Sequence, residues 1–387
     1  MPARQMSLAA IRDELPALQR QVYLNSGGAG PVPRCAGDAM TAAVLADVGR
    51  PRMSLAAWTE SDALLDATRR AAASAIDAHH ADVALVQNTT VGIDLVLWGL
   101  DWRAGDHLVS TEAEYPGVAA AIAVLADRFG IAVTWITRED ATTDLAGAVT
   151  AAMTESTRMV LVSHVDWGTG EVFDIAAVTA AAHAGGALCV VDGAQSVGAI
   201  PCRPADTGVD AYTFPAQKWL LGPEGLGALW VRRDVCDLLQ LSLTGYDAGT
   251  DHAAHGTFVP RPGARRFENS TVPLICAAGW VAAIDWLSDA VGWDVVFERT
   301  AAMHAEARRT LEAIDGVSVL TPPGRQAGLL TFTIEGVIPD EGAARMAAAG
   351  VILRWVPSPM AFRASTGFFT DDGDIDALAN AVRTLRS

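Results

Sequence analysis

Short apolar runs alternate with longer alanine-rich stretches between about residues 84 and 231, and this rhythm restricts the fold more than any other feature. The stretches GVAAAIAVLADRFG and DIAAVTAAAHAGG have helical length and end in glycine. Strands that alternate with helices predict an α/β fold, with a mostly parallel, doubly wound sheet covered on both faces. The predicted strands are ALVQN (84–88), HLVST (107–111), IAVTWIT (131–137), TRMVLVSHV (157–165), ALCVVDGA (187–194), DAYTFPA (210–216) and GLGALWV (225–231).

The rhythm changes after about residue 235. Residues 245–268 are rich in Gly, Pro and His and predict an extended loop. A long helical region (about 275–313), strands near 317–334 and 351–356, and a helix from about 374 follow. We therefore predict an N-terminal segment (1–35) that joins a smaller domain, a large domain (36–260), and a linker helix with a small α+β C-terminal domain (261–387).

Lys218, in FPAQKWLLGPEG (214–225), is the only lysine, and the other 27 basic residues are arginine. Biased composition can leave one lysine by chance. Arginine, however, does not lose its proton in a protein, whereas a lysine amine can approach neutrality and attack a carbonyl. The retained lysine therefore indicates Schiff-base chemistry.

Charge and cysteine content restrict the partners. The net charge is −17 and no basic run is present, which disfavours a nucleic-acid surface or an anionic membrane and favours small molecules. The N-terminus does not resemble a signal peptide, and no later run approaches the length of a membrane span, so we expect a cytoplasmic protein. The five cysteines form no CxxC pair, and we expect no metal site. The sequence does not indicate a role for the 245–268 loop or for His252 and His255 within it.

The carboxyl ends of the predicted strands are where ligands bind in such sheets. Asn88-Thr89-Thr90 opens a helix there, and such residues can cap the helix or bind phosphate. Tyr115 follows the next strand and can serve packing or lie against a flat ring. His164 follows another, and a lone histidine there is more often a hydrogen-bonded structural residue than a catalyst.

Asp192 ends a buried strand 26 residues before Lys218. An acidic partner for a pyridinium nitrogen, combined with a Schiff-base lysine, is the pattern of a pyridoxal phosphate site. The alternatives lack their motifs: no correctly spaced G-x-G-x-x-G, no GK[ST] and no G-x-S-x-G is present.

With these residues in place, the chain resembles the class V aminotransferases of fold type I, whose relatives include cysteine desulfurases, isopenicillin N epimerase-like enzymes and C–S lyases. The likeness covers nearly the whole chain. It is carried by YLNSGGAGPVP (23–33), NTTVGIDL, VDGAQSVG, QKWLLGPEGLGALWV, RFENSTVP (266–273) and FRASTGFFTDDGDID (362–376).

The resemblance implies a homodimeric pyridoxal phosphate enzyme for an amino-acid-type substrate, with each active site shared across the interface and the cofactor held in the large domain. It implies catalytic Lys218 and Asp192, the lysine forming the Schiff base and moving the Cα proton. Arg363 would bind the substrate carboxylate, although a surface salt bridge is its alternative, and Asn25 would lie near the substrate. The other implied cofactor contacts are Gln195 with the ring oxygen, Tyr115 stacked on the ring, and Thr89, Thr90, Gln217 and the partner subunit's Thr271 at the phosphate.

Two departures from the family pattern affect the expected reaction. Pro215 stands where many relatives have a hydroxyl that contacts the phosphate. Desulfurases of the family carry a mobile, sulfur-accepting cysteine between the positions matching Arg354 and Arg363, and this chain has none there. We therefore expect β-elimination of the C–S lyase type and not cysteine desulfuration. Transamination, epimerisation and a catalytically silent scaffold or sensor are the alternatives.

Overall fold

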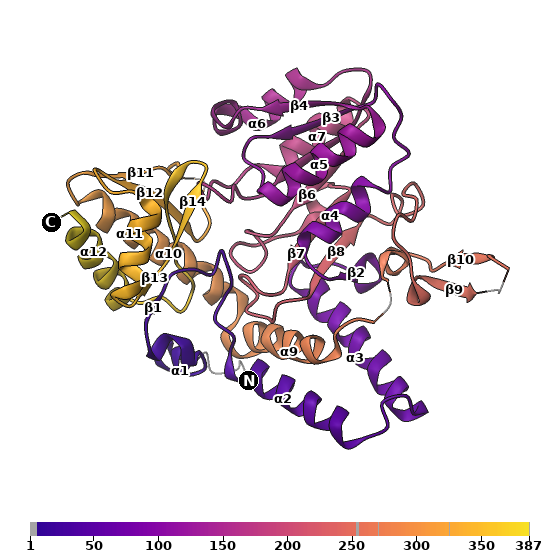
Figure 1. Cartoon of the computed structure of the whole chain (residues 1–387), viewed down its shortest axis with the longest axis horizontal. Helices are drawn as coiled ribbons and strands as arrows, with labels where there is room; N and C mark the ends of the chain where they lie inside the picture. The colour runs from indigo at the N-terminus through magenta and orange to yellow at the C-terminus, as the bar shows by residue number, and fades with distance from the viewer. Residues whose placement is uncertain (1–5, 253–254, 270, 325, 387) are drawn as a thin grey trace.

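A seven-stranded sheet forms the centre of the computed structural model, which describes residues 6–252 (without the side chain of His252), 255–269, 271–324 and 326–386. Its strand order is β2-β8-β7-β6-β5-β3-β4, with β8 antiparallel to both neighbours and the other pairs parallel. Each predicted run overlaps one strand, and the mostly parallel doubly wound sheet is confirmed (Figure 1). The strands are β2 (Val83–Val86), β3 (His107–Thr111), β4 (Ala132–Ile136), β5 (Thr157–Ser163), β6 (Leu188–Asp192), β7 (Ala211–Pro215) and β8 (Gly227–Val231).

Both faces of this sheet are buried. Within β5, Val160 and Val162 belong to one apolar cluster, whereas Met159 and Leu161 belong to a second. Successive side chains of a strand point to opposite faces, so the two clusters are the two cores that the helices cover. These helices are α3 (Leu55–Ser74), α4 (Thr89–Leu97), α5 (Pro116–Phe129), α6 (Arg138–Ala152), α7 (Ile175–Ala184) and α9 (Leu274–Asp285). The short helix α8 (Pro204–Thr207) contacts α7.

A smaller antiparallel sheet has the order β11-β12-β15-β14. Its strands are β11 (Val317–Val319), β12 (Leu329–Ile334), β14 (Arg354–Pro357) and β15 (Met360–Ser365), packed with α10 (Trp293–Glu312), α11 (Pro339–Ala348) and α12 (Asp372–Arg386). Neither α11 nor β15 was predicted from the sequence.

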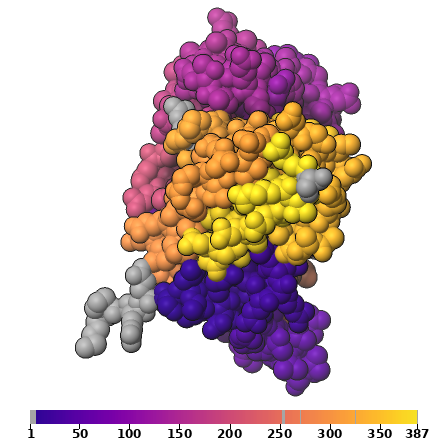
Figure 2. Space-filling model, turned by 90° about the vertical axis from the view of Figure 1, so that its left-hand side faces the viewer, coloured from indigo at the N-terminus to yellow at the C-terminus, as the bar shows by residue number. Residues whose placement is uncertain are grey.

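The N-terminal segment lies against this smaller unit (Figure 2). After α1 (Leu8–Asp13), strand β1 (Val22–Tyr23) pairs in parallel with β13 (Val351–Ile352). Arg12 also pairs with Asp374, at 2.6 Å between Nη1 and Oδ2. The boundaries 1–35, 36–260 and 261–387 themselves stay a prediction.

Two expectations about local structure were wrong. Within residues 245–268, β9 (Gly249–His252) and β10 (Phe258–Pro260) form an antiparallel hairpin between the short helices Tyr246–Ala248 and Ala264–Phe267. Threonine, phenylalanine and valine favour paired strands there, and Gly256 adopts a positive φ of 82° near the turn, where His255 is exposed.

The second correction concerns Leu274–Val291, which is long and apolar enough to span a membrane by length and composition alone. It comprises α9 and a π-helix (Trp286–Val291), and 44% of it is buried. Helix α9 packs on α2 (Arg34–Gly49), where a Cβ at Gly279 would lie 2.6 Å from Met40 Cγ. A core helix of a water-soluble protein has the same properties, because burial needs the same apolar surface.

Candidate active site

A cavity of about 440 Å³ lies at the carboxyl ends of the large-sheet strands and reaches the smaller sheet. Eight of the ten residues predicted to form the site line it, namely Thr89, Thr90, Tyr115, Asp192, Gln195, Gln217, Lys218 and Arg363. Their chain positions span 275 residues, so the fold brings together what the sequence separates. The two that do not line it are Asn25 and Thr271.

Lys218 lies just after β7, in a turn that the N-terminal segment holds down. The Gly30 N–H donates to the Gln217 carbonyl at 2.7 Å, and a Cβ at Gly30 would lie 2.3 Å from the Lys218 carbonyl oxygen. Burial lowers the pKa of Lys218 to about 8; Asp192 opposes this shift, and Arg363 and Arg354 add to it. About a tenth of a group with that pKa is neutral at pH 7, which is the form that attacks a carbonyl.

Asp192 ends β6 and is 5% exposed. Its Oδ1 accepts the Ala194 N–H at 2.7 Å. Burial raises the pKa of Asp192, while the charge of Lys218 and the Ala194 N–H lower it. An acceptor held this rigidly at a strand end is suited to pair with one positively charged ring nitrogen.

The start of α4 places Thr89 and Thr90 in the wall of the cavity. Asn88 caps the helix, since its side chain accepts the Val91 N–H at 3.0 Å. The cap explains the asparagine but not the two threonines at the first helical positions. Their roles, and that of Gln217, as phosphate ligands stay a prediction.

An aromatic and an amide group lie near Lys218. The Tyr115 ring centroid is 5.9 Å from Lys218 Nζ, and its ring meets Trp167 edge-on at 5.6 Å. Gln195 Nε2 donates to the Gly27 carbonyl at 2.9 Å, and its Oε1 accepts the Trp219 N–H at 3.0 Å. The Gln195 amide therefore keeps one N–H for a ligand.

Arg363, on β15, is 1% exposed and has no acidic partner within the described part of the chain. Its Nη1 donates to the Trp167 carbonyl at 2.6 Å, while Nε and Nη2 are buried without a hydrogen-bond partner. Burial and the nearby charge of Arg354 lower the pKa of Arg363 to about 9. Nε and Nη2 form one edge of the guanidinium, which matches the two oxygens of a carboxylate.

Asn25 and Thr271 lie outside the cavity wall of their own chain. Asn25 forms a bridge with Ser365, and the cavity is lined instead by its neighbours Gly27 and Gly28. Thr271 is exposed and has a positive φ of 66°. Its predicted contact is with a partner subunit, so it stays a prediction.

Four residues of the site region have no role predicted from the sequence. Arg354, Trp167 and Ser163 line the cavity, and Glu114 is buried beside it. The Glu114 carboxylate accepts the Ser163 hydroxyl at 2.6 Å and the Thr111 hydroxyl at 2.8 Å. Ser163 and Trp167 could have been identified as site residues by their position at or just after the end of a predicted strand. Arg354 could have been found as the cross-strand partner of Arg363.

His164 is a hydrogen-bonded structural residue, as predicted from the sequence. Its Nδ1 lies 2.6 Å from the Tyr212 hydroxyl, which is also 2.6 Å from Ser196 Oγ. Burial lowers the pKa of His164 to about 4, so the ring is neutral at pH 7.

The arrangement fits the pyridoxal phosphate that the resemblance implies. A lysine with a lowered pKa and a buried carboxylate face one cavity, together with a helix N-terminus, and the cavity lies in the size range of cofactor sites. The Gln217 side-chain oxygen is buried without a hydrogen-bond partner, and a half-turn of the amide would present a donor there instead. Within the described residues, no group of three or more His, Cys, Asp or Glu side chains is placed to hold a metal.

Comparison with known proteins gives consistent matches. The sequence model of the family described as Aminotransferase class-V matches residues 22–378. A probable cysteine desulfurase of Methanothermobacter thermautotrophicus is 29% identical, over 89% of this chain and 86% of the relative. The isopenicillin N epimerase of Streptomyces clavuligerus is 28% identical, over 94% of each.

Solved structures of the cystine C–S lyase C-DES are also similar. A mutant with glycine covalently linked to the PLP cofactor has a TM-score of 0.92 at 28% identity and covers 97% of this chain and 99% of that one. The complex of C-DES with its reaction product cysteine persulfide has a TM-score of 0.91 at 28% identity and covers 96% and 99%.

Proposed function

The chain belongs to the class V aminotransferase family, whose members are pyridoxal-phosphate-dependent enzymes of fold type I, and from this premise we propose that it acts on an L-amino acid or a derivative by removing the Cα proton. We favour β-elimination of the C–S lyase type as the outcome. When bound, pyridoxal phosphate supplies an electron-accepting ring for the charge left on Cα.

The single observation that carries the substrate class is the free guanidinium edge of Arg363. A buried cation without a counter-ion is costly, and an anionic ligand removes that cost. Arg354 is its cross-strand partner and lines the same cavity, which increases the positive charge near the bound carboxylate. A substrate carboxylate on Nε and Nη2 would fix the amino acid in one orientation.

The chain's own groups then supply proton handling. Lys218 would be bonded to the cofactor at rest, and its amine, once released, would take the proton from Cα and hold it on Nζ. Asp192 would keep its negative charge against the ring nitrogen. Thr89, Thr90 and Gln217 would hold the phosphate.

We propose that sulfur is not passed to a cysteine of this chain. Residues 355–362 form most of a tight β-hairpin between Arg354 and Arg363 and contain no cysteine. Cys189, Cys202 and Cys236 are buried, and burial raises the pKa of each thiol to about 11 or 12. Within the described residues, no cysteine lines the cavity, so an attacking thiolate is missing despite the desulfurase names of several relatives.

Epimerisation is the second candidate, because an epimerase matches 94% of this chain. Transamination is an alternative outcome of the same proton removal, and a silent scaffold is the alternative without chemistry. Retention of Lys218 in an otherwise lysine-free chain argues against the scaffold.

We also propose a homodimer with shared active sites, located in the cytoplasm, that binds neither nucleic acid nor membrane. Val48, Met53 and Leu55, around the α2–α3 connection, are about 80% exposed, which is unusual for a free surface. Thr271 is exposed on its own chain and so remains accessible to a partner's cofactor. Sedimentation analysis that finds only a monomer would contradict this proposal.

The test is a visible spectrum of the protein with pyridoxal phosphate, recorded with a panel of L-amino acids, followed by mass spectrometry of the products. Pyruvate, ammonia or a released thiol supports elimination, whereas a keto-acid-reversible pyridoxamine form indicates transamination. Loss of α-deuterium with racemisation indicates an epimerase.

Borohydride reduction, digestion and peptide mass spectrometry test the lysine itself. We expect the cofactor tag on the peptide that contains Lys218 and no tag in the Lys218→Arg variant, because a guanidinium cannot form the bond. A wild-type tag on any other peptide would overturn the proposal.

A further inference from the structure

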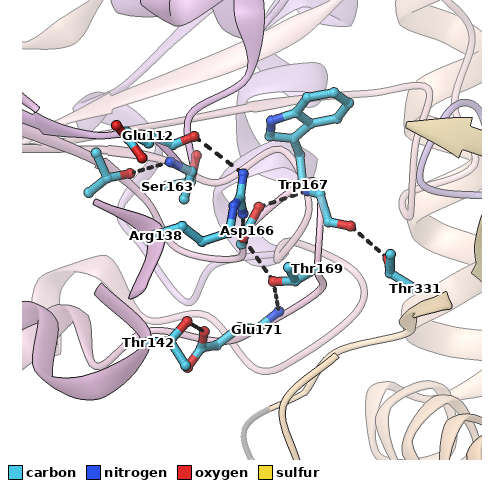
Figure 3. A network of polar contacts seen from close by, with 12 residues as sticks. Glu112, Arg138, Thr142, Ser163, Asp166, Trp167, Thr169, Glu171 and Thr331 are labelled. Carbon is cyan, nitrogen blue, oxygen red and sulfur yellow. Dashed lines mark hydrogen bonds and ion pairs between the residues drawn. The ribbon is translucent and has the colours of Figure 1, made fainter. Parts of the chain in front are cut away.

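The turn formed by residues 166–171 (the Asp166 turn) lies between the two sheets. It begins shortly after β5 of the large sheet, and its carbonyl groups contact the smaller one. Figure 3 shows the side chain of Asp166, the first residue of this turn, beside Arg138, with Thr331 approaching the turn from the other side. The turn is therefore a direct polar connection between the sheets.

Inside the turn, Asp166 is fully buried and organises the backbone. Its Oδ1 accepts the Gly168 N–H at 2.7 Å, and its Oδ2 accepts the Thr169 hydroxyl at 2.8 Å. A buried carboxylate also needs an opposite charge, which Arg138 provides through an ion pair.

Arg138 occupies an unexpected position for an arginine. It is the first residue of α6, where the helix dipole favours acidic side chains, and Glu139 and Asp140 follow it in the same turn. Its ion pair with Asp166, together with its hydrogen bond to the Glu112 carbonyl at 3.2 Å, accounts for the arginine there.

On its outer side, the turn presents three successive carbonyl oxygens. Those of Gly168 and Thr169 accept the hydroxyls of Thr331 and Thr321 at 2.6 and 2.5 Å. That of Trp167 accepts Nη1 of Arg363 at 2.6 Å. The turn cannot shift toward the hairpin, because a Cβ at Gly168 would already lie 2.5 Å from the Ser358 carbonyl oxygen.

We propose that Asp166, held by Arg138, is a positioning residue that fixes the rotation of the Arg363 guanidinium. The inference rests on the proposed function, in which Arg363 binds the substrate carboxylate. Because Nη1 is bound to the Trp167 carbonyl, Nε and Nη2 are the edge left for the ligand. Without the Asp166 charge the turn loses its ion pair, and the Trp167 carbonyl no longer holds Nη1 in one place.

The experiment measures binding of a carboxylate without chemistry. Propionate has no amine to react with the cofactor, and its dissociation constant for the holoenzyme is obtained by calorimetry. We expect binding to wild type, loss of binding in Arg363→Ala, and about tenfold weaker binding in Asp166→Asn and in Arg138→Gln. Arg138→Lys keeps the charge and should stay within about threefold of wild type, and the Asp166→Asn/Arg138→Gln double variant should be no weaker than either single variant.

Asp210→Asn is the matched control. Asp210 is also fully buried and pairs with Arg232 at 2.9 Å, but it lies just before β7, at the opposite edge of the sheet from the cavity. We expect this variant to lose stability and to keep wild-type propionate binding. The visible spectrum of the bound cofactor should be unchanged in the variants of Asp166, Arg138 and Asp210. The test does not use the spectrum of Arg363→Ala.

The results that would refute the positioning role of Asp166 differ from those that would refute carboxylate binding by Arg363. Wild-type propionate affinity in both Asp166→Asn and Arg138→Gln refutes the positioning role while the proposed function stands, and if one of the two does not fold the other decides. Additive losses in the double variant also refute it. Unchanged binding in Arg363→Ala, or no binding to wild type, refutes the carboxylate role of Arg363 on which the inference rests.

Discussion

Glu114→Gln should change how stability depends on pH. Glu114 is 5% exposed, and its carboxylate accepts hydrogen bonds from the Thr111 hydroxyl, the Ser163 N–H and the Ser163 hydroxyl. Burial raises its pKa from 4.5 to about 7; the hydrogen bonds oppose this shift and the charge of Asp192 adds to it. Glutamine has nearly the same shape and does not titrate.

The size of the effect follows from the pKa. Each pH unit corresponds to about 1.4 kcal/mol, so the rise corresponds to about 3 kcal/mol. The folded chain binds the proton more tightly than the unfolded chain. The Glu114 contribution is therefore fully present below about pH 4.5 and is lost as the pH rises to about 7.

Urea denaturation of wild type and variant between pH 5 and pH 8, after removal of the cofactor, measures the difference. Other titrating groups, such as His164 and Lys218, are common to both proteins and largely cancel. We expect the variant to gain stability relative to wild type, by about 3 kcal/mol at most, as the pH rises. Glu112→Gln, at an exposed glutamate two residues away, should run parallel to wild type. Parallel curves for Glu114→Gln would falsify the assignment.

Two further predictions concern the scaffold. Gly193→Ala places a Cβ 2.1 Å from Tyr212 Cε1, so we expect a loss of about 1–3 kcal/mol in urea denaturation; Gly37→Ala, in helix α2 with nothing within 4 Å, should instead gain about 0.5–1 kcal/mol. Glu268→Gln breaks the buried pair with Arg69, whose two contacts are 2.7 and 2.6 Å, and should cost about 3–5 kcal/mol. In that variant Arg69 keeps only Asp66, a half-exposed carboxylate, as its acidic partner. Adding Arg69→Met removes the buried charge and should recover part of that loss, so a double variant less stable than the single one would contradict this account.

The local pattern predicted the strands well because burial on both faces leaves a distinct apolar run. HLVST (107–111) coincides with β3, and the other six runs overlap their strands. The pattern could not predict that β8, the last of these strands, lies between β2 and β7, because that placement depends on contacts distant in sequence. The β9–β10 hairpin was missed because the Gly and Pro content outweighed the short strand-forming runs.

The sequence predicted the two central residues of the site better than the residues around them. Lys218 and Asp192 were identifiable because few residue types can do what they are proposed to do, and the structure brings both to one cavity. Glu114 was missed because a glutamate in sequence carries no sign of being buried. The unsatisfied edge of Arg363 depends on the Trp167 carbonyl, 196 residues away, and no local motif reports it.

The placement of β8 also has a consequence for the newborn chain. Among the strands that the structure describes, β2 pairs with β8 alone, so residues 83–86 must wait for residues 227–231 before this pairing can form. The β1–β13 pair waits still longer, for residues 351 and 352. An unpaired apolar strand invites pairing with other chains. During synthesis on the ribosome, residues 83–86 are therefore the segment of the large sheet that waits longest for its strand partner.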